Sequence, residues 1–178
     1  MLLQHTSQVF SPLVNISTFH AQSIGGATFR QSAGVASAAY PSANLAIYIP
    51  FRIDIPITVT NLYSYNGSAV SGNIDIGIYN NLGGLIVSKG TTAQAGTSAI
   101  QTFSITATSL TPGQYYLAVA MDNTTGTLFT ISLAQIAFLQ VIGMAQQATA
   151  FVLPSTATFA SSTNNYIPCI GLTTRSFV

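Results

Sequence analysis

The sequence predicts an all-β protein, a jelly-roll β-sandwich of about eight antiparallel strands with an extended N-terminal arm. Two observations favour this class. Apolar residues alternate with polar or small ones through much of the chain, which is the pattern of strands with one buried face. Turn signals rich in Asn, Gly and Pro separate these runs at the spacing of about 8–12 residues that is typical of sandwiches and barrels.

The 178-residue chain suits one domain with an attached arm. We place the arm at residues 1–42 and the jelly-roll domain at residues 43–178, with a C-terminal extension from about residue 145. In the arm, scattered apolar side chains stand among Ser, Thr, Gln and Gly, and we expect at most one short strand, near residues 13–19. These side chains need their own domain or a neighbouring subunit to bury them. We therefore predict an assembly role for Phe10, Leu13, Ile16 and Phe19.

The longest regular pattern covers residues 45–59, where every odd position carries an aliphatic or aromatic side chain. Two prolines interrupt the other face, and a proline cannot donate to a strand ladder. They mark an edge or a crossing between sheets. We therefore predict two strands, residues 44–52 and 57–65, with a corner at residues 54–56.

A hairpin is predicted between residues 73 and 89. Isoleucines at alternate positions form one face of its first strand, and polar or small residues with one tyrosine form the other. The alternation stops at residues 80–84, whose Asn and Gly residues tolerate positive φ, and a second β-rich run follows. We interpret this hairpin as the sheet partner of residues 45–59.

The remaining elements follow the same logic. Further strands are predicted around residues 102–107, 115–121, 128–132 and 166–172, with turns at residues 111–113 and 122–126. Between residues 133 and 143 the apolar spacing approaches the helical period, so we expect one short helix that ends at Gly143.

Composition points to an assembled protein. Hydrophobic residues make up 48% of the chain but charged residues only 4%, and Glu is absent. An ordinary soluble domain carries about 25% charged residues. A net charge of +1 provides little repulsion between copies, and β proteins near neutrality tend to associate. We therefore expect the chain to function inside an assembly.

Several partner classes are disfavoured. The four Lys and Arg residues are far apart in sequence, so we expect no nucleic-acid partner. The N-terminus lacks the basic start and apolar run of a signal peptide. The most apolar stretch, residues 131–144, falls short of the about 20 residues that a spanning helix needs, so we expect no membrane insertion. Cys169 has no second cysteine to pair with inside the chain, and a small hydrophobic role is its simplest interpretation, with an intermolecular bridge as the alternative.

We predict no enzymatic activity and no cofactor. Both histidines, His5 and His20, lie in the arm, and no Ser stands with a His and an acid at a familiar spacing. Asp122 is the one metal candidate, because residues 122–126 offer several oxygens to Ca²⁺. A single carboxylate provides little affinity, so a turn is the preferred interpretation of this segment.

Tyrosines provide the candidate ligand-binding residues. A tyrosine ring has a flat apolar face and a polar tip, which suits stacking against a sugar. The candidates for glycan stacking are Tyr63, Tyr65 and Tyr79. Ordinary packing within a sheet is the alternative interpretation, and the chain has no Trp, the strongest stacking residue.

Between residues 47 and 129 the chain resembles a family of small jelly-roll virion proteins of tailed bacteriophages. The segments that carry the resemblance are Ile49-Pro50-Phe51-Arg52, Leu62 to Gly67, Val70 to Tyr79, Lys89 to Ser98 and Leu110 to Ala118, with Pro154 to Phe159 and Tyr166-Ile167-Pro168 near the end. The family has no shared catalytic residues. This sequence departs from it at Leu82-Gly83-Gly84, where the family carries a more acidic loop.

The resemblance implies a virion protein on the particle surface, made in the host cytoplasm. We expect a capsid decoration, or cement, protein or a short fibre subunit, anchored by its arm and assembled as a homotrimer. Its partners would be other virion proteins, such as the major capsid protein or a neck or tail component. The alternative is a lectin-like receptor-binding protein on the tail that recognises a host surface glycan. A cellular carbohydrate-binding module fits less well, because the signal peptide and Trp are missing.

Overall fold

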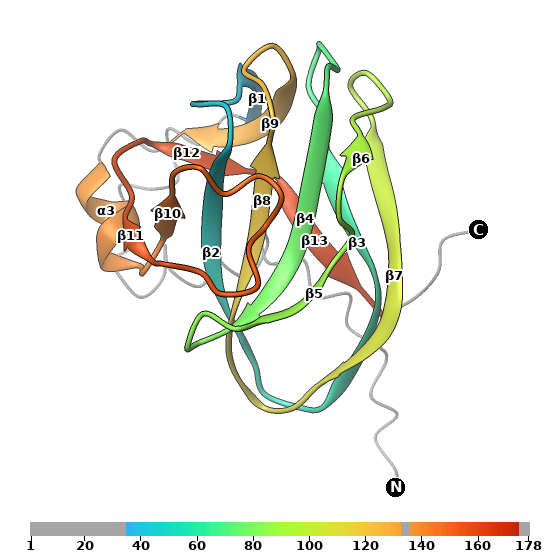
Figure 1. Ribbon diagram of the computed structural model, residues 1–178, viewed down its shortest axis with the longest axis vertical. Coiled ribbons are helices and arrows are strands. Elements are labelled where there is room, and N and C mark those ends of the chain that lie inside the picture. Colours follow the sequence, from blue (N-terminus) through green and yellow to red (C-terminus); the bar gives the residue numbers. More distant parts are fainter. Residues whose placement is uncertain (1–34, 133–135, 175–178) are drawn as a thin grey trace, which may run out of the picture.

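The computed structural model describes residues 35–132 and 136–174 and shows antiparallel sheets with one short helix (Figure 1). The predicted all-β class is therefore confirmed. Thirteen strands are present in the described part, more than the eight or so expected, because several of them are only two to five residues long.

The elements in chain order are β1 (Val35–Ala39), β2 (Leu45–Ile53), β3 (Ile57–Tyr65), β4 (Asn73–Asn80), β5 (Leu85–Ser88), β6 (Thr92–Ala93), β7 (Ile100–Leu110), β8 (Gly113–Met121), β9 (Thr127–Ser132), α3 (Ile136–Val141), β10 (Ala145–Gln147), β11 (Ala160–Ser161), β12 (Tyr166–Pro168) and β13 (Ile170–Thr173). Among these residues no helix is long and apolar enough to cross a membrane.

One layer is a sheet with the strand order β11-β10-β2-β8-β4-β5, with β6 also paired to β4. The other layer consists of two three-stranded sheets, β1-β9-β12 and β13-β3-β7. These two sheets meet at Cys169, whose N–H donates to the Phe129 carbonyl and whose own carbonyl accepts from Tyr65 N, both at 2.8 Å. The buried Cys169 thiol fits the expected small hydrophobic role, and burial raises its pKa to about 11.

Two pairs of strands connect the layers. β2 pairs with β8 in the first layer, and β3 pairs with β7 in the second. Because β2 leads into β3 and β7 leads into β8, both connections pass from one layer to the other side by side. The predicted corner, residues 54–56 between β2 and β3, lies at this crossing, and so does the predicted turn that begins at Thr111-Pro112, between β7 and β8. The predicted strands on either side of residues 54–56 are confirmed almost to the residue.

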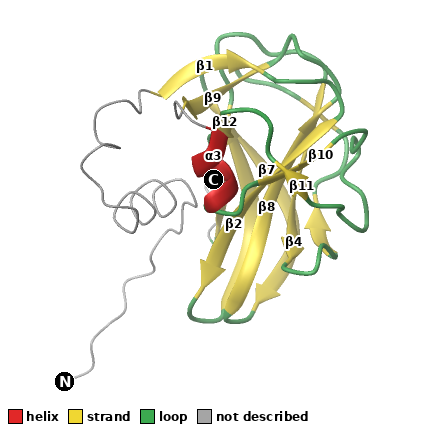
Figure 2. Ribbon diagram, turned by 90° about the vertical axis from the view of Figure 1, so that its left-hand side faces the viewer, coloured by secondary structure: helices red, strands yellow, loops and turns green. Residues whose placement is uncertain are grey.

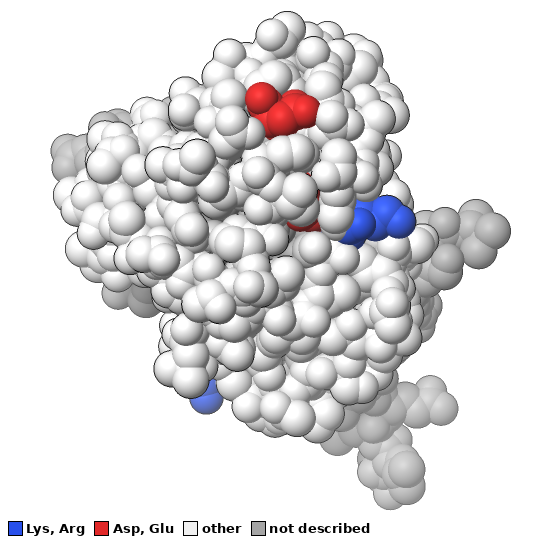
Figure 3. Space-filling model, viewed as in Figure 1, with Lys and Arg blue, Asp and Glu red and all other residues white. Residues whose placement is uncertain are grey.

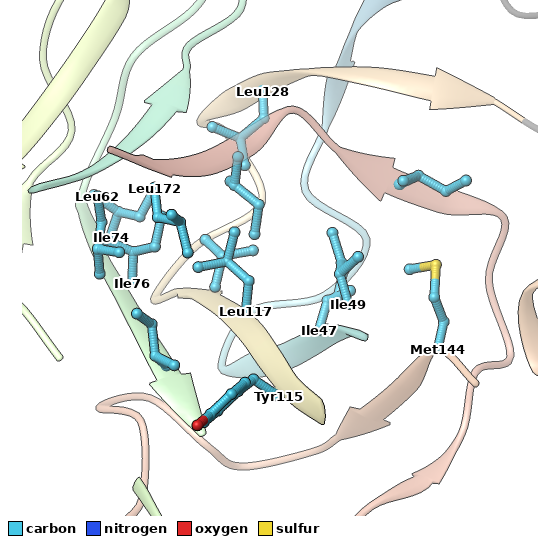
Figure 4. Close-up of a cluster of buried hydrophobic side chains, with 14 of the residues drawn as sticks. Ile47, Ile49, Leu62, Ile74, Ile76, Tyr115, Leu117, Leu128, Met144 and Leu172 are labelled. Carbon is cyan, nitrogen blue, oxygen red and sulfur yellow. The ribbon is translucent and has the colours of Figure 1, made fainter. Parts of the chain in front are cut away.

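The main hydrophobic core lies between the layers (Figure 4). The odd-numbered face of residues 45–53 and the isoleucine face of β4 both contribute to it, as their alternation predicted. Its fully buried members include Ile47, Ile49, Leu62, Ile74, Ile76, Ile78, Leu117, Leu128 and Leu172.

A second apolar cluster covers the outer face of the first layer, although the sequence pattern had predicted strands with only one buried face. Ala46, Ala118 and Ala120 of the sheet pack there with residues of the segment 145–159, which runs across β2, β8 and β4. Central β4 is consequently buried on both faces. The small side chains of the sheet leave room for this segment, which is the C-terminal extension predicted from about residue 145.

The structure shortens the predicted arm and locates the predicted helix. The arm was expected to reach residue 42, but Val35–Ala39 form β1 and pair with β9, so the folded unit already includes them. The predicted helix is confirmed at Ile136–Val141 and is followed by Gly143 at φ 84° (Figure 2). Residues 1–34, with the assembly residues of the arm and the strand expected near residues 13–19, lie outside the described residues, as do residues 133–135.

Candidate functional site: an aromatic strip on the outer face of the second layer

Two of the three predicted stacking residues lie together on the outer face of the second layer. Tyr63 and Tyr65 are two positions apart on β3, so their rings project from the same face. Tyr65 stacks on Phe129 of β9, with ring centroids 4.1 Å apart and planes inclined by 29°. All three side chains are half-buried. We call Tyr63, Tyr65 and Phe129 the aromatic strip.

A glycine positions the first ring of the strip. Gly171 of β13 is paired directly with Tyr63, and a Cβ at this glycine would lie 2.1 Å from the Tyr63 ring. The ring therefore lies across the glycine backbone. A glycine within a strand often marks such a close approach, and any other residue here would displace the ring.

Uncharged residues border the strip. On β7, Thr102 is paired with Tyr63 and Ile100 with Tyr65. On β1, Ser37 is paired with Phe129. Ile100 is 64% exposed. Charged side chains are also sparse on the opposite side of the molecule, that of the first layer, which Figure 3 presents. Flat aromatic rings with hydroxyl tips in an uncharged setting can contact either a sugar ring or an uncharged protein surface.

The structure contradicts the predicted stacking role of the third residue, Tyr79. Its side chain is fully buried, its hydroxyl donates to the Pro154 carbonyl at 2.6 Å, and its ring meets Tyr48 edge-on with centroids 5.3 Å apart. Burial raises its pKa well above the usual value. Tyr79 cannot reach a ligand, because the segment that follows β10 covers the face of β4 on which it lies.

Asp122 stabilises a turn. Its carboxylate accepts from the backbone N–H of Asn73 at 2.9 Å and from the side-chain amides of Asn73 and Asn123, both at 2.7 Å. The Asn123 amide oxygen in turn accepts from Thr125 N and Gly126 N, which fixes its amide nitrogen toward Asp122. An N–H donor thus points at the carboxylate where a cation would need an oxygen. These bonds favour the turn interpretation.

The loops beside Asp122 are joined by buried amide side chains that the sequence did not single out. Asn66 is fully buried, and its amide nitrogen donates to the Ala95 carbonyl at 2.6 Å and to Gln101 Oε1 at 2.9 Å. Its oxygen accepts from Ser64 Oγ at 2.9 Å. An Asn-Gly pair signals a turn, but alternation cannot show that the same Asn will connect two loops.

Asp75 is a buried carboxylate with a similar structural role. It is fully buried on β4, and its two oxygens accept from Gly90 N at 2.8 Å and from Leu153 N at 3.0 Å. Desolvation raises its pKa, although these hydrogen bonds oppose the rise. Asp75 thus joins two parts of the chain to the sheet, the loop after β5 and the segment 145–159, which we call the covering segment. Within the described ranges, no three His, Cys, Asp or Glu residues lie close enough to hold a metal ion.

Comparisons of this chain with protein-family models, with curated proteins and with solved structures found no match.

Proposed function

We propose that this chain is a non-enzymatic structural subunit on the exterior of a tailed-bacteriophage particle, a capsid decoration or cement protein or a short fibre subunit. The observation that carries the proposal is the combination of a two-layer sandwich, packed on both faces of β4, with a chain of only 4% charged residues. The jelly-roll connectivity belongs to the same proposal, and the paired strands that cross together from one layer to the other support it.

An uncharged surface suits permanent burial between subunits. Removing an ion from water costs several kcal/mol unless it is paired, whereas Ser, Thr, Asn and Gln side chains need only hydrogen-bond partners. The loops are also held in place before any partner binds, by Asn66 and Asp122 among others. Preformed loops lower the entropy cost of association. Both properties favour a subunit that is built into a particle as a homotrimer.

The arm completes the proposal. Phe10, Leu13, Ile16 and Phe19 would anchor the subunit to a neighbouring copy or to another virion protein, such as the major capsid protein or a neck or tail component. The folded part starts by Val35, so the arm to be tested ends at residue 34.

The test is the copy number and position of the protein on purified particles of the phage that encodes it. Quantitative mass spectrometry should find several tens of copies per particle, as symmetric shells require, whereas fewer than about a dozen copies confined to the tail would contradict a decoration role. The second test uses a variant that lacks residues 1–34. This variant should keep the circular dichroism of the folded chain and fail to join particles. Normal incorporation of this variant would show that the arm is not the anchor.

The aromatic strip favours a second candidate, a tail protein that binds a host glycan. Tyr63 and Tyr65 offer two ring faces about 7 Å apart along one strand, a spacing suited to neighbouring sugar units. A glycan array should then detect binding that Tyr63→Ala and Tyr65→Ala abolish. Leu82→Ala, at an 84% exposed side chain in the β4–β5 turn, is the matched control and should leave binding unchanged.

A further inference from the structure

The outer edge of β7 is an open strand edge. β7 is the longest strand described, with eleven residues, and it ends the sheet order β13-β3-β7 (Figure 1). In the described part of the chain no other strand pairs with its outer side. Residues that follow β5 do contact β7: Lys89 donates to the Ser104 carbonyl, and the Gln101 side chain bonds the backbone of Ala93 and Ala95. Its sequence contains no charged residue, no Pro and no Gly. Edge strands usually carry such residues to prevent pairing with other chains.

The backbone groups that face outward can be identified from one contact. Lys89 Nζ donates to the Ser104 carbonyl at 3.3 Å, so the backbone of Ser104 faces away from β3. The register with β3 is regular from Ile100 to Ser104. Because hydrogen-bonding direction alternates along a strand, Thr102 and Ile100 also direct their N–H and C=O groups outward.

This regular edge ends after Ser104. Val59 is paired with Thr108 and Asn61 with Ser104, so three β7 residues lie opposite one residue of β3. Such a bulge bends the strand, so the outer edge loses its regular spacing there, although β3 and β7 pair again from Thr108 onward. The usable edge is therefore residues 100–104, in which Ile100, Thr102 and Ser104 all have exposed side chains.

We propose that residues 100–104 pair antiparallel with the same residues of a second copy, about a two-fold axis at Thr102. Thr102 then lies opposite its own equivalent, and Ile100 lies opposite Ser104 of the other copy. Each of these pairs exchanges two backbone hydrogen bonds. Threonine pairs are favourable across strands, and no like charges meet because β7 has none.

Lys89 sets the salt dependence of this contact. The two copies of Lys89 lie about four residue steps apart along the paired strands, or about 13 Å. This separation exceeds the Debye length of about 8 Å at physiological ionic strength, so their repulsion weakens pairing only at low salt. The contact is two-fold and therefore differs from the one that would build a trimer. The pairing proposed here is independent of the proposed role in a virion.

Crosslinking of the full-length chain tests the geometry directly. Directly opposed residues have Cα atoms about 5.5 Å apart, within disulfide range, so Thr102→Cys should form a covalent dimer on mild oxidation. Thr106→Cys, in the bulge, is the matched control and should remain uncrosslinked. Equal crosslinking of the two variants, or none with Thr102→Cys, would overturn the proposal.

Sedimentation velocity provides the second measurement. The wild-type chain should self-associate in a concentration-dependent manner, and Thr102→Pro should weaken this association at least about tenfold, because proline removes an outward N–H without affecting the β3 ladder. Thr102→Val retains the N–H and should associate like the wild type. Circular dichroism confirms that each variant is folded. A folded Thr102→Pro variant that associates normally would contradict the proposal.

Discussion

At the scale of single residues, Asp75 connects two segments that are distant in sequence. Its carboxylate is fully buried, and it accepts one backbone N–H from the loop after β5 and another from the covering segment. A buried N–H that loses its acceptor costs about 1–3 kcal/mol. Asp75 therefore stabilises the arrangement of both segments on β4, although its charge is itself costly to bury.

Replacing Asp75 by Ala should destabilise the fold markedly. Two backbone N–H groups, those of Gly90 and Leu153, would lose their acceptor, so we expect the free energy of unfolding to fall by about 2–4 kcal/mol. Urea denaturation measures this change. Asp54→Ala is the control, because Asp54 is exposed and forms a surface ion pair with Arg52, which contributes at most about 1 kcal/mol. Equal losses in the two variants would contradict the structural role of Asp75.

The same carboxylate predicts a pH dependence of stability. Burial raises the pKa of Asp75 in the folded chain above its ordinary 3.8, so the folded state holds this proton more tightly than the unfolded state. Its contribution to stability is therefore greatest below pH 3.8 and decreases as pH rises through the folded pKa. The pKa of Asp122 shifts in the opposite direction. Desolvation would raise it, but hydrogen bonds from Asn123 and Asn73 outweigh this effect and lower it. The contribution of Asp122 to stability is therefore lost on acidification.

Comparison with Asp75→Asn separates the two contributions, because Asp122 is unchanged in that variant. The difference in free energy of unfolding, wild type minus Asp75→Asn, should decrease as pH rises from about 3 through the folded pKa of Asp75. Urea titrations across this range provide the measurement. A difference that stays constant, or that grows with pH, would show that the carboxylate is not held preferentially in its protonated form.

For single residues, the sequence identified tyrosines as candidates for stacking but could not show which of them are exposed. Tyr63 and Tyr65 lie on an outer face, as stacking residues must. Tyr79 is buried, although it lies on the face of β4 opposite the isoleucines. Alternation reports that a strand has two faces. It cannot report that a segment about 75 residues later will cover the second face, because that depends on long-range packing.

At the scale of elements, the close contact between β4 and the covering segment depends on Gly77. A Cβ at this position would lie 2.8 Å from the Val87 carbonyl oxygen, 2.9 Å from Ser88 Cβ and 3.1 Å from Leu153 Cδ1. Real Cβ atoms essentially never approach a carbonyl oxygen so closely. β5 and the covering segment can therefore pack against β4 at this distance only if residue 77 has no side chain.

Gly77→Ala should therefore separate these elements. Overpacking of this kind costs about 1–3 kcal/mol, and thermal unfolding would detect it as a lower Tm. Gly113→Ala is the matched control, since its Cβ would lie an ordinary 3.5 Å from the Tyr115 ring and the strand begins there. We expect the control to stay within about 0.5 kcal/mol of the wild type. An unchanged Tm for Gly77→Ala would mean that the segment moves away without cost.

Strands with strong alternation were predictable, and short strands were not. The sequence located β2, β3 and the β4–β5 hairpin closely, because a long isoleucine face and Gly- or Pro-rich turns determine them locally. It missed β1, whose sequence Val-Ala-Ser-Ala-Ala has no alternation and which is a strand because β9 provides its partner. The same reason applies to β10 and β11, which are three and two residues long.

At the scale of the whole molecule, stability should be distributed unevenly between the two layers. β8 lies between β2 and β4, and its second half is completely buried. β7, in contrast, ends the second layer, and most of its side chains are exposed or half-buried. Local opening requires less free energy where fewer apolar contacts must break, so an edge strand opens without the rest of the molecule.

Hydrogen exchange should make this difference visible. Amides of β8 should exchange only through global unfolding, so their exchange free energy should fall with urea as steeply as that of the whole chain. Amides of β7 should exchange through smaller openings that depend weakly on urea, when measured at a concentration low enough to prevent pairing between copies. At high concentration, Thr102 should gain protection if the proposed edge contact forms, whereas Thr106 in the bulge should not. Protection of β7 equal to that of β8 in the dilute sample would contradict this distribution, because an open edge cannot be as stable as a strand paired on both sides.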